Sequence, residues 1–391
     1  MKFRFLEYLL LAALLLSAIA CGHNNNPLTN SGAGLLYVTT QGNNSVAAYT
    51  VSLSNGSLSV LGNAAATGAT PSAMAITPSV SALFVADSAA NTISAYAINT
   101  DGTLTAASGS TPTGKDPVAM DIDRSGKFLF VANQVASNVS VFTINGTGLT
   151  AVPGSPFSTI PTGFSFPNGT LPSAVAVSAS GTFLYVANQL ADFVSVFKVD
   201  PASGALTVPG VPLYVTGSGP DALNINPSGG FLYVANSGSN NVSAFAICDA
   251  VVTSCINPNA PDGTLTAVQN SPFSTGLSPR AIAADPNFNF MYIVGADTVS
   301  QYSYSSGTGV LTPLSPPTIS TGLNPVSITV RAGATGTNVG NTTTNPTDYV
   351  YVANNGAGTI SAYTLATTTG LLTVLGSPVA NFAQPSAVAT K

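Results

Sequence analysis

The sequence predicts an all-β fold, a seven-bladed β-propeller of four-stranded antiparallel blades whose ring is closed by the C-terminal strand. Three observations favour this fold: a signature that recurs seven times, strand-like runs between the signatures, and two chain ends that complete one another. Glycine and proline are frequent, with 37 and 27 copies among 391 residues, which is typical of β structure with many turns.

The recurring signature is an aromatic residue followed by Val-Ala-Asn or a variant of it. It begins at Tyr37, Phe84, Phe130, Tyr185, Tyr233, Tyr292 and Tyr351. A second short run follows each signature, as at residues 139–142 and 194–197, and its residues alternate with the period of two that a strand requires. The sequence therefore contains two adjacent strands in each repeat.

Two further runs complete each repeat. One contains Gly-x-Leu-Thr, as at 102–105 and 263–266, and leads into Gly-Ser-Pro at 154–156. The other begins with a proline, as at 71–76 and 172–177. Four short strands in a repeat of about 40 to 50 residues are the pattern of a propeller blade.

The two ends of the chain predict how the ring closes. No proline-led run precedes the signature at Tyr37, whereas a proline-led run at 385–390 ends the chain without a signature after it. Pairing these ends would complete one blade and remove the exposed sheet edges that favour aggregation. We therefore expect a single propeller over residues 35–391. Two stacked solenoid halves are the alternative, and the shared blade argues against them.

The first twenty residues have the features of an export signal. Lys2 and Arg4 precede an apolar run at 9–16, and a small-x-small cleavage site follows at 18–20. A buried helix or membrane anchor is the alternative, but the run is shorter than the roughly 20 residues that a spanning helix needs. We expect residues 1–20 to be removed and the Asn-rich residues 21–34 to form a tether.

The three cysteines predict the location of the protein. Cys248 and Cys255 lie seven positions apart in one loop and are expected to pair in an oxidising compartment, which leaves Cys21. Residues 18–20 followed by Cys21 resemble a bacterial lipobox, although Ala18 stands where Leu is commonest. We expect a lipid on Cys21 to anchor the protein to the membrane of the bacterial cell envelope, on its periplasmic side or at the surface. Without the lipid the protein would be secreted.

Charged residues are scarce in this chain. Lys and Arg number 9 and Asp and Glu number 14, which makes 6% of the sequence charged and gives a net charge of −5. No basic field is available for phosphates, so nucleic acid is not expected as a partner. Without His clusters or free Cys pairs we expect no metal site and no cofactor. A closed ring has no edge that requires pairing, so a monomer is expected.

Candidate ligand-binding residues follow the prolines that lead one strand of each repeat. By propeller topology these positions approach the channel mouth, where ligands usually bind. They are Ser72, Val118, Ser173, Asp221, Arg280, Val326 and Ser386. Only Asp221 and Arg280 are charged, and they form either a structural ion pair or a polar anchor for a small anionic or carbonyl ligand. Lys115 and Asp116 precede Pro117 on the same face and are further candidates, with solvated loop charges as the simpler interpretation.

Other recurring polar residues are expected to be structural. Asparagines fall at one repeat position, at Asn133, Asn188, Asn236 and Asn354, where they are predicted to stabilise turns. Serines such as Ser140 have no histidine to activate them, so we expect no serine nucleophile. An insertion at 157–171 carries Phe164 and Phe166 on the ligand-side face, where it would form a lid, a partner-binding rim or a loop that only packs over blade edges.

The repeats resemble those of a known family. Residues 126–133, Gly-Lys-Phe-Leu-Phe-Val-Ala-Asn, and residues 204–207, Gly-Ala-Leu-Thr, are similar to the seven-bladed β-propeller lactonase family, with its 6-phosphogluconolactonase-like members, and to YVTN-type surface-protein repeats. The resemblance implies the propeller fold over nearly all of the mature chain. It also implies an enzyme that uses His, Arg and Glu at the mouth to handle a lactone. Here the only His is His23 and the only Glu is Glu7, both before the ring, so no catalytic residue is carried over.

Two functions from different classes are therefore expected. The first is a binding or interaction platform for a small-molecule, carbohydrate or protein ligand, because the ring lacks the family's catalytic side chains. The alternative is a divergent extracytoplasmic lactonase that hydrolyses a sugar-type lactone at the propeller mouth. In that enzyme Asp221 would serve as the base and Arg280 would stabilise the oxyanion.

Overall fold

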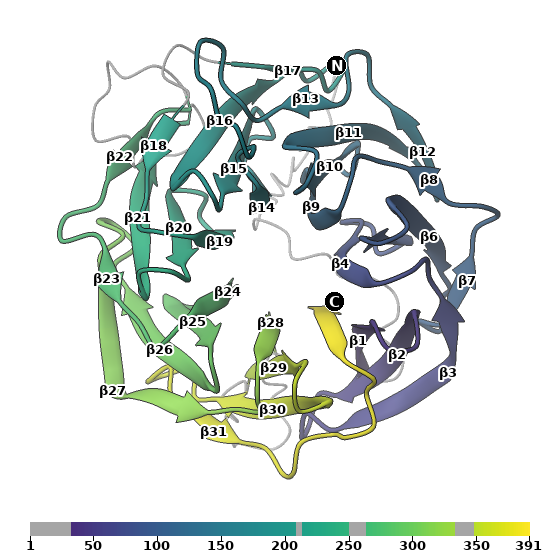
Figure 1. The fold of residues 1–391 in the computed structure, drawn as a ribbon. Coiled ribbons are helices and arrows are strands. Elements are labelled where there is room, and N and C mark those ends of the chain that lie inside the picture. Colours follow the sequence, from purple (N-terminus) through teal and green to yellow (C-terminus); the bar gives the residue numbers. More distant parts are fainter. Residues whose placement is uncertain (1–32, 209–212, 250–262, 333–347) are drawn as a thin grey trace, which may run out of the picture.

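The computed structural model is a ring of seven antiparallel sheets around a central channel (Figure 1). It describes residues 33–208, 213–249, 263–332 and 348–391. Every regular element in these ranges is a β-strand, and no helix there is long and apolar enough to cross a membrane. The predicted all-β, seven-bladed architecture is therefore confirmed.

The blades are numbered here in chain order, and the strand nearest the channel is the proline-led one (Figure 1). Blade 1 contains β1 (Ala33–Thr40), β2 (Ser45–Ser52), β3 (Leu58–Ala66) and β32 (Pro385–Thr390). Blade 2 contains β4 (Pro71–Ile76), β5 (Ala82–Asp87), β6 (Thr92–Ile98), β7 (Leu104–Ala106) and β8 (Thr111–Pro112). Blade 3 contains β9 (Pro117–Ile122), β10 (Phe128–Asn133), β11 (Asn138–Asn145), β12 (Gly148–Ala151) and β13 (Phe157–Ser158). Blade 4 contains β14 (Pro172–Val177), β15 (Phe183–Asn188), β16 (Phe193–Val199), β17 (Leu206–Thr207) and β18 (Leu213–Val215).

The remaining three blades follow the same order from the channel outward. Blade 5 contains β19 (Pro220–Ile225), β20 (Phe231–Asn236), β21 (Asn241–Ile247), β22 (Leu265–Ala267) and β23 (Phe273–Ser274). Blade 6 contains β24 (Pro279–Ala284), β25 (Phe290–Gly295), β26 (Thr298–Tyr304) and β27 (Leu311–Ser320). Blade 7 contains β28 (Pro325–Arg331), β29 (Asp348–Asn354), β30 (Thr359–Leu365) and β31 (Leu372–Val374).

The C-terminal strand closes the ring as predicted. β32 pairs antiparallel with β1, with Val388 opposite Val38 and Thr390 opposite Leu36. Beyond the strand, Leu35 and Lys391 exchange two backbone hydrogen bonds, with N···O distances of 3.0 and 3.1 Å. Ring closure therefore depends on residues that are more than 340 positions apart in the sequence.

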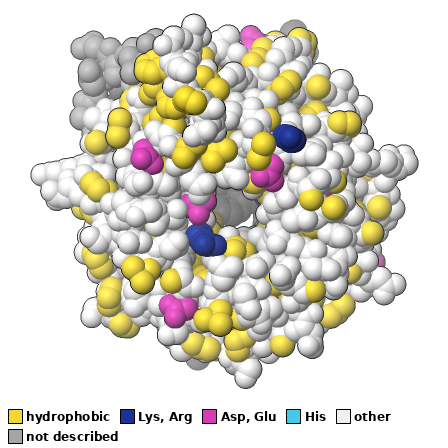
Figure 2. All heavy atoms as spheres, viewed as in Figure 1, with side chains coloured by type: hydrophobic (Ala, Val, Ile, Leu, Met, Phe, Trp, Pro, Cys, Tyr) yellow, Lys and Arg dark blue, Asp and Glu magenta, His cyan; other side chains and the backbone are white. Residues whose placement is uncertain are grey.

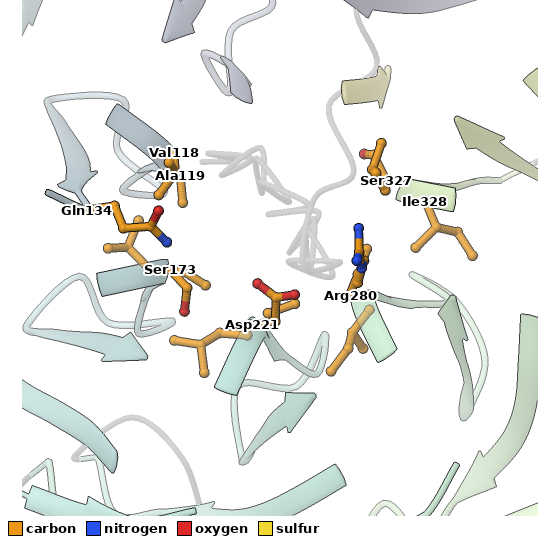
Figure 3. Close-up of a pocket in the computed structure, with 15 residues that line it drawn as sticks. Val118, Ala119, Gln134, Ser173, Asp221, Arg280, Ser327 and Ile328 are labelled. Carbon is orange, nitrogen blue, oxygen red and sulfur yellow. The ribbon is translucent and has the colours of Figure 1, made fainter. Parts of the chain in front are cut away.

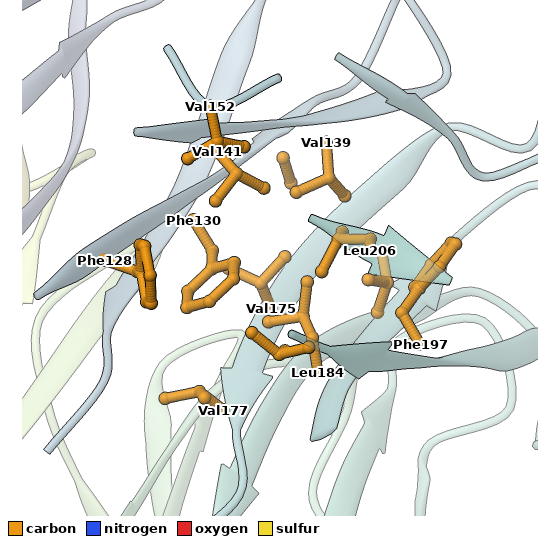
Figure 4. Packing of buried hydrophobic residues seen from close by; sticks show 13 residues of the cluster. Phe128, Phe130, Val139, Val141, Val152, Val175, Val177, Leu184, Phe197 and Leu206 are labelled. Carbon is orange, nitrogen blue, oxygen red and sulfur yellow. The ribbon is translucent and has the colours of Figure 1, made fainter. Parts of the chain in front are cut away.

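The core lies between the blades. Seven apolar clusters are found in the described residues, and each is formed by two neighbouring blades. Between blades 3 and 4, for example, Phe130 and Val141 pack with Val175 and Leu184 (Figure 4). Because each blade is covered on both faces, second strands such as β10 and β15 are buried along their whole length.

The outer strand of a blade differs from the single run that the sequence predicts. In blades 2 to 5 it consists of two short segments that both pair with the third strand. In blade 3 the gap between the segments is filled by a serine, because the backbone N–H of Val141 donates to Ser155 Oγ at 2.9 Å. In blade 5 Ala244 donates to Ser271 Oγ in the same way, at 2.9 Å. The serine before the recurring proline therefore replaces a backbone acceptor of the ladder.

The aromatic residues that begin the signatures join adjacent blades. All seven are fully buried. In four of them the hydroxyl donates to the carbonyl of a turn glycine in the next blade, at 2.7 to 2.9 Å: Tyr37 to Gly102, Tyr233 to Gly309, Tyr292 to Gly370 and Tyr351 to Gly56. These glycines all have positive φ, a backbone conformation that glycine adopts without a Cβ clash.

Two of these tyrosines make a matched test of this link. Tyr292→Phe is expected to lower the free energy of unfolding by about 1 to 2 kcal/mol, because it leaves the Gly370 carbonyl buried without its partner. The Tyr185 hydroxyl is buried and has no hydrogen-bond partner among the described residues, so Tyr185→Phe is expected to cost nothing or to stabilise the protein. Urea unfolding of both variants measures the difference. Equal losses would show that the hydroxyl bond does not contribute.

The recurring asparagines stabilise the hairpins that follow them, as predicted. The side-chain amide of each donates to the hydroxyl of a serine in the third strand, at 2.9 to 3.0 Å: Asn133 to Ser140, Asn188 to Ser195, Asn236 to Ser243 and Asn354 to Ser361. These contacts lie within one blade and are repeated around the ring. They explain the recurrence of both residue types without a ligand.

Several predicted features fall outside the described residues. They are the export signal at 1–20, most of the tether at 21–34 including Cys21, and Cys255. Cys248 is described, buried, and continues β21, since its backbone exchanges hydrogen bonds with Gly263 and Thr264. The Cys248–Cys255 disulfide stays a prediction. β1 begins at Ala33, two residues before the predicted start of the ring.

Candidate functional site at the channel mouth

Each inner strand begins with a backbone irregularity that turns one side chain toward the mouth. In β19 Pro220 pairs with Asn236 and Ala222 pairs with Ala235, so Asp221 is an extra residue in the ladder. The same register shift occurs near the start of every inner strand. Such a bulge bends the strand and redirects its side chain.

The residue before each strand-leading proline has a positive φ. Gly219 holds this position in blade 5, and the other six are Thr70, Asp116, Leu171, Ser278, Asn324 and Gln384, with φ between 48° and 58°. In the six residues other than glycine this conformation is strained and persists only where the surroundings hold it. The preceding blade does so in part: Asn91 Oδ1 accepts from Asp116 N at 2.8 Å, and Asp192 Oδ1 accepts from Gly219 N at 2.7 Å.

Three of the seven residues after the prolines are used to join blades. The hydroxyls of Ser72, Ser173 and Ser386 each donate to the carbonyl of the strand-leading proline of the next blade, at 2.6 to 2.7 Å. Val118 and Val326 are apolar. The ionisable side chains at this level of the ring are therefore those of Asp221 and Arg280, on adjacent blades.

A cavity of about 450 Å³ opens at this end of the channel. Figure 2 shows the opening at the centre of the ring, with an acidic and a basic side chain at its rim. The starts of the inner strands of blades 3 to 7 line it, with Gln134 from a neighbouring hairpin. Asp221, Arg280 and the amide of Gln134 point into the opening (Figure 3). The structure thus brings the two charged sequence candidates into one cavity.

Asp221 is a mostly buried carboxylate. Its Oδ1 accepts a hydrogen bond from Gln189 Nε2 at 3.3 Å, which orients the group from blade 4. Burial raises the pKa of Asp221 to about 6, and the nearby charge of Arg280 opposes part of that rise. At neutral pH the carboxylate is mainly ionised, and its affinity for a proton suits a general base.

Arg280 is exposed and is held from the other side of the site. Its Nη1 donates to Asn324 Oδ1 at 2.9 Å, and Asn324 is the residue with positive φ before Pro325 in blade 7. Each charge is therefore positioned by a neutral side chain of an adjacent blade. Asp221 and Arg280 interact electrostatically across the opening, and the guanidinium keeps donors for a ligand oxygen.

Lys115 and Asp116 do not line this cavity. Lys115 is exposed, and burial raises the pKa of the Asp116 carboxyl. The carbonyl of Asp116 accepts from Gln134 N at 2.8 Å, so its backbone holds the hairpin that carries Gln134. The structure therefore gives Asp116 a position beside the site and leaves Lys115 at the surface.

Two amide residues of the site are not among the residues predicted from the sequence. Gln134 lines the cavity and Gln189 orients Asp221. Each directly follows the asparagine that ends a signature, in Asn133-Gln134 and Asn188-Gln189, and this was the available signal. Their role in the site comes from their position beside a neighbouring blade, and the pattern of residues within one repeat does not predict contacts between blades.

A second hollow of about 340 Å³ lies farther along the channel and includes Asp121. The Asp121 carboxylate accepts from the backbone N–H groups of Ile122 and Val177, at 2.8 and 2.9 Å. Burial raises the pKa of Asp121 to about 6, and Lys391 opposes part of the rise. Both carboxylate oxygens have backbone partners, so the group joins blades 3 and 4.

In the part of the chain that the structure describes, no three His, Cys, Asp or Glu side chains gather as metal ligands would.

Comparison with protein families identifies the repeats. Three overlapping matches to the family described as Lactonase, 7-bladed beta-propeller, cover residues 27–113, 88–155 and 146–252, together more than half of the chain. The chain belongs to the seven-bladed β-propeller lactonase family. The only His and the only Glu of this lactonase-family chain, His23 and Glu7, precede β1.

Solved structures share the fold of this lactonase-family chain. A Bacteroides fragilis protein provisionally assigned as a 6-phosphogluconolactonase is similar with a TM-score of 0.74 and 20% identity, over 93% of this chain and 99% of its own. The periplasmic gluconolactonase of Pseudomonas aeruginosa has a TM-score of 0.71 and 20% identity, over 92% and 98% of the two chains. A Lactobacillus plantarum protein has a TM-score of 0.71 and 18% identity, over 92% of this chain and 99% of its own. Comparison with curated sequences gives no significant match.

Proposed function

We propose that the channel mouth binds and hydrolyses a lactone, with Asp221 as general base and Arg280 as the group that stabilises the oxyanion. One observation carries the proposal: a partly buried carboxylate with a raised pKa and an exposed guanidinium face the same cavity of about 450 Å³. Family membership supports lactones as the substrate class. A sugar-type lactone is the first candidate, since a neighbour in fold is described as a gluconolactonase. A phosphorylated lactone is less favoured because one arginine makes a weak phosphate site.

The proposed reaction uses one carboxylate twice. Ionised Asp221 accepts a proton from a water molecule, whose oxygen forms a bond to the lactone carbonyl carbon. The carbonyl oxygen becomes an oxyanion, which the guanidinium of Arg280 stabilises. When the tetrahedral intermediate collapses, the bond to the ring oxygen breaks, and Asp221 returns its proton to that oxygen. Lactone and water become a hydroxy acid, whose carboxylate can pair with Arg280 before release.

The proposal is tested by turnover. Glucono-δ-lactone and a panel of other lactones are incubated with the purified protein, and acid release at constant pH is compared with spontaneous ring opening. Acid release faster than the spontaneous rate, and proportional to protein concentration, is expected. If no lactone is hydrolysed, catalysis at the mouth is refuted.

A binding or interaction platform is the second candidate function. The chain from residue 33 onward contains no His or Glu, the residues that enzymes of the family use at the mouth. In that case Asp221, Arg280 and Gln134 would hold a small polar ligand without turning it over. Lactone binding by calorimetry together with the absence of turnover would favour this candidate.

We further propose that the protein is exported and anchored to the cell envelope by a lipid on Cys21. The motivation is the charged, apolar and small-residue pattern of residues 1–20 followed by this cysteine. Cys21→Ala is expected to move the protein from the membrane fraction to the soluble extracytoplasmic fraction. An unchanged membrane fraction would contradict the lipid anchor.

A further inference from the structure

Exposed hydrophobic side chains are unevenly distributed on the ring. Among the described residues ten large ones are exposed, and five of these lie in loops of the mouth face: Val135 (54% exposed), Phe164 (57%), Leu190 (50%), Leu277 (68%) and Leu323 (64%). The other five, Val60, Val208, Val215, Val374 and Val379, lie on or beside the outer strands. We call the first five the apolar collar. Grouped exposed apolar side chains of this kind are typical of binding surfaces.

The collar is built next to the residues of the cavity. Val135 follows Gln134, and Leu190 follows Gln189, which donates to Asp221. On the other side of the mouth, Leu323 precedes Asn324, which accepts from Arg280. The side chains that orient Asp221 and Arg280 therefore each have an exposed apolar residue next to them in the sequence, Leu190 beside Gln189 and Leu323 beside Asn324.

The insertion at 157–171 adds an aromatic surface to this collar. Phe164 and Phe166 are nearly parallel, with ring centroids 6.5 Å apart and planes 18° apart, and Phe166 contacts buried Phe193 at 5.6 Å. Figure 2 shows hydrophobic side chains gathered beside the opening, over β14 to β16. The insertion therefore packs on blade 4 and still leaves Phe164 exposed.

Hydrogen bonds fix the insertion against the hairpins that carry the collar. Thr170 N donates to Ser137 Oγ at 3.1 Å, and Leu190 N donates to the Thr170 carbonyl at 3.2 Å. The hydroxyls of Thr159 and Thr170 are 2.6 Å apart. The collar residues of blades 3 and 4 thus belong to one braced unit, so a ligand that contacts them meets a preformed surface.

We propose that the apolar collar binds an alkyl or acyl substituent of the lactone whose ring occupies the cavity. The inference rests on the proposed function of the mouth and refines its substrate class to a lactone, of sugar type or not, whose ring carries an apolar tail. A tail leaving the cavity past Gln134 or Gln189 would meet Val135 and Leu190, which directly follow these residues in the sequence. Phe164 belongs to the insertion that is hydrogen-bonded to both hairpins.

The test measures binding, so that it does not depend on turnover. δ-Hexalactone and δ-decalactone are titrated by calorimetry into Asp221→Asn protein, which lacks the proposed base. The longer lactone has four additional methylenes. Because each is expected to be partly buried on the collar, they are expected to tighten binding roughly tenfold. Adding Phe164→Ser or Leu190→Ser is expected to remove most of that preference. Val60→Ser, at a more exposed site on β3, is the control and is expected to retain it.

The outcomes separate the collar from the catalytic proposal. Equal affinity for the two lactones, or a preference that Phe164→Ser and Leu190→Ser leave intact, overturns the inference. The inference is also overturned if the protein shows no preference for the longer lactone and instead binds vesicles or dimerises, and Phe164→Ser abolishes that binding. The collar would then bind a membrane or a second copy of the chain. If the wild-type protein hydrolyses no lactone but the collar residues still give a preference for the longer lactone, the inference is supported and only the proposed hydrolysis is refuted.

Discussion

Removal of the C-terminal strand, residues 385–391, is expected to abolish the cooperative unfolding of the ring. β32 supplies the inner strand of blade 1, and its loss leaves the backbone of β1 unpaired along that edge. It also removes Val388 from the cluster that contains Leu36 and Val38. The strand bridges its neighbours too, because Ser386 Oγ donates to the Pro71 carbonyl and Val388 N donates to Ser327 Oγ.

The truncation is measured by urea unfolding and by solubility. The truncated chain is expected to aggregate or to unfold without a sharp transition, and a synthetic peptide of residues 385–391 is expected to restore part of the transition. Ser386→Ala is the matched control, since it keeps the strand and removes only the hydroxyl that bonds to the Pro71 carbonyl and to Thr39, and it is expected to cost about 1 to 2 kcal/mol. A truncated protein with an unchanged transition would show that β32 does not close the ring.

The phase of the repeats made this closure predictable from sequence. Each repeat carries the same aromatic signature and proline-led run, so the ends of the chain could be assigned to one blade without any tertiary information. The interruption of the outer strands was not predictable in that way. It depends on Ser155 replacing a backbone acceptor for Val141, a local exchange that leaves no trace in hydrophobic periodicity.

The candidate site was predictable in position but not in chemistry. Asp221 and Arg280 stood out because they are the charged members of a recurring position, and the structure brings both into one cavity. The partners that orient them, Gln189 and Asn324, belong to other blades, and so does the burial that raises the pKa of Asp221. Lys115 was selected by proximity in sequence to a proline, but it does not line the cavity. Spacing along one strand does not determine such contacts between blades.

Asp221→Asn is expected to lower kcat for lactone hydrolysis by about 10² to 10⁴-fold while leaving a lactone bound at the mouth. Asparagine keeps the size of the side chain and can still interact with Gln189, but it does not accept the proton of the attacking water. Stopped-flow or pH-stat assays measure kcat and KM separately. Asp116→Asn is the matched control, because Asp116 lies on the same face and outside the cavity, and it is expected to keep the wild-type rate. Equal rates for wild type and Asp221→Asn would remove Asp221 from the mechanism.

The pH dependence of the wild-type enzyme gives an independent readout of the same group. The proposed base acts only when ionised, and burial raises the pKa of Asp221 to about 6, so kcat/KM is expected to be constant above that pH and to fall tenfold per unit below it. Arg280 lowers the pKa of Asp221, so Arg280→Gln is expected to move this acidic limb of the pH profile to higher pH. The same substitution removes the group that stabilises the oxyanion and is expected to slow the reaction by about 10² to 10³-fold. A merely structural arginine would change stability without moving the limb. A limb that stays at the same pH in Arg280→Gln would therefore contradict the proposed coupling between the two side chains.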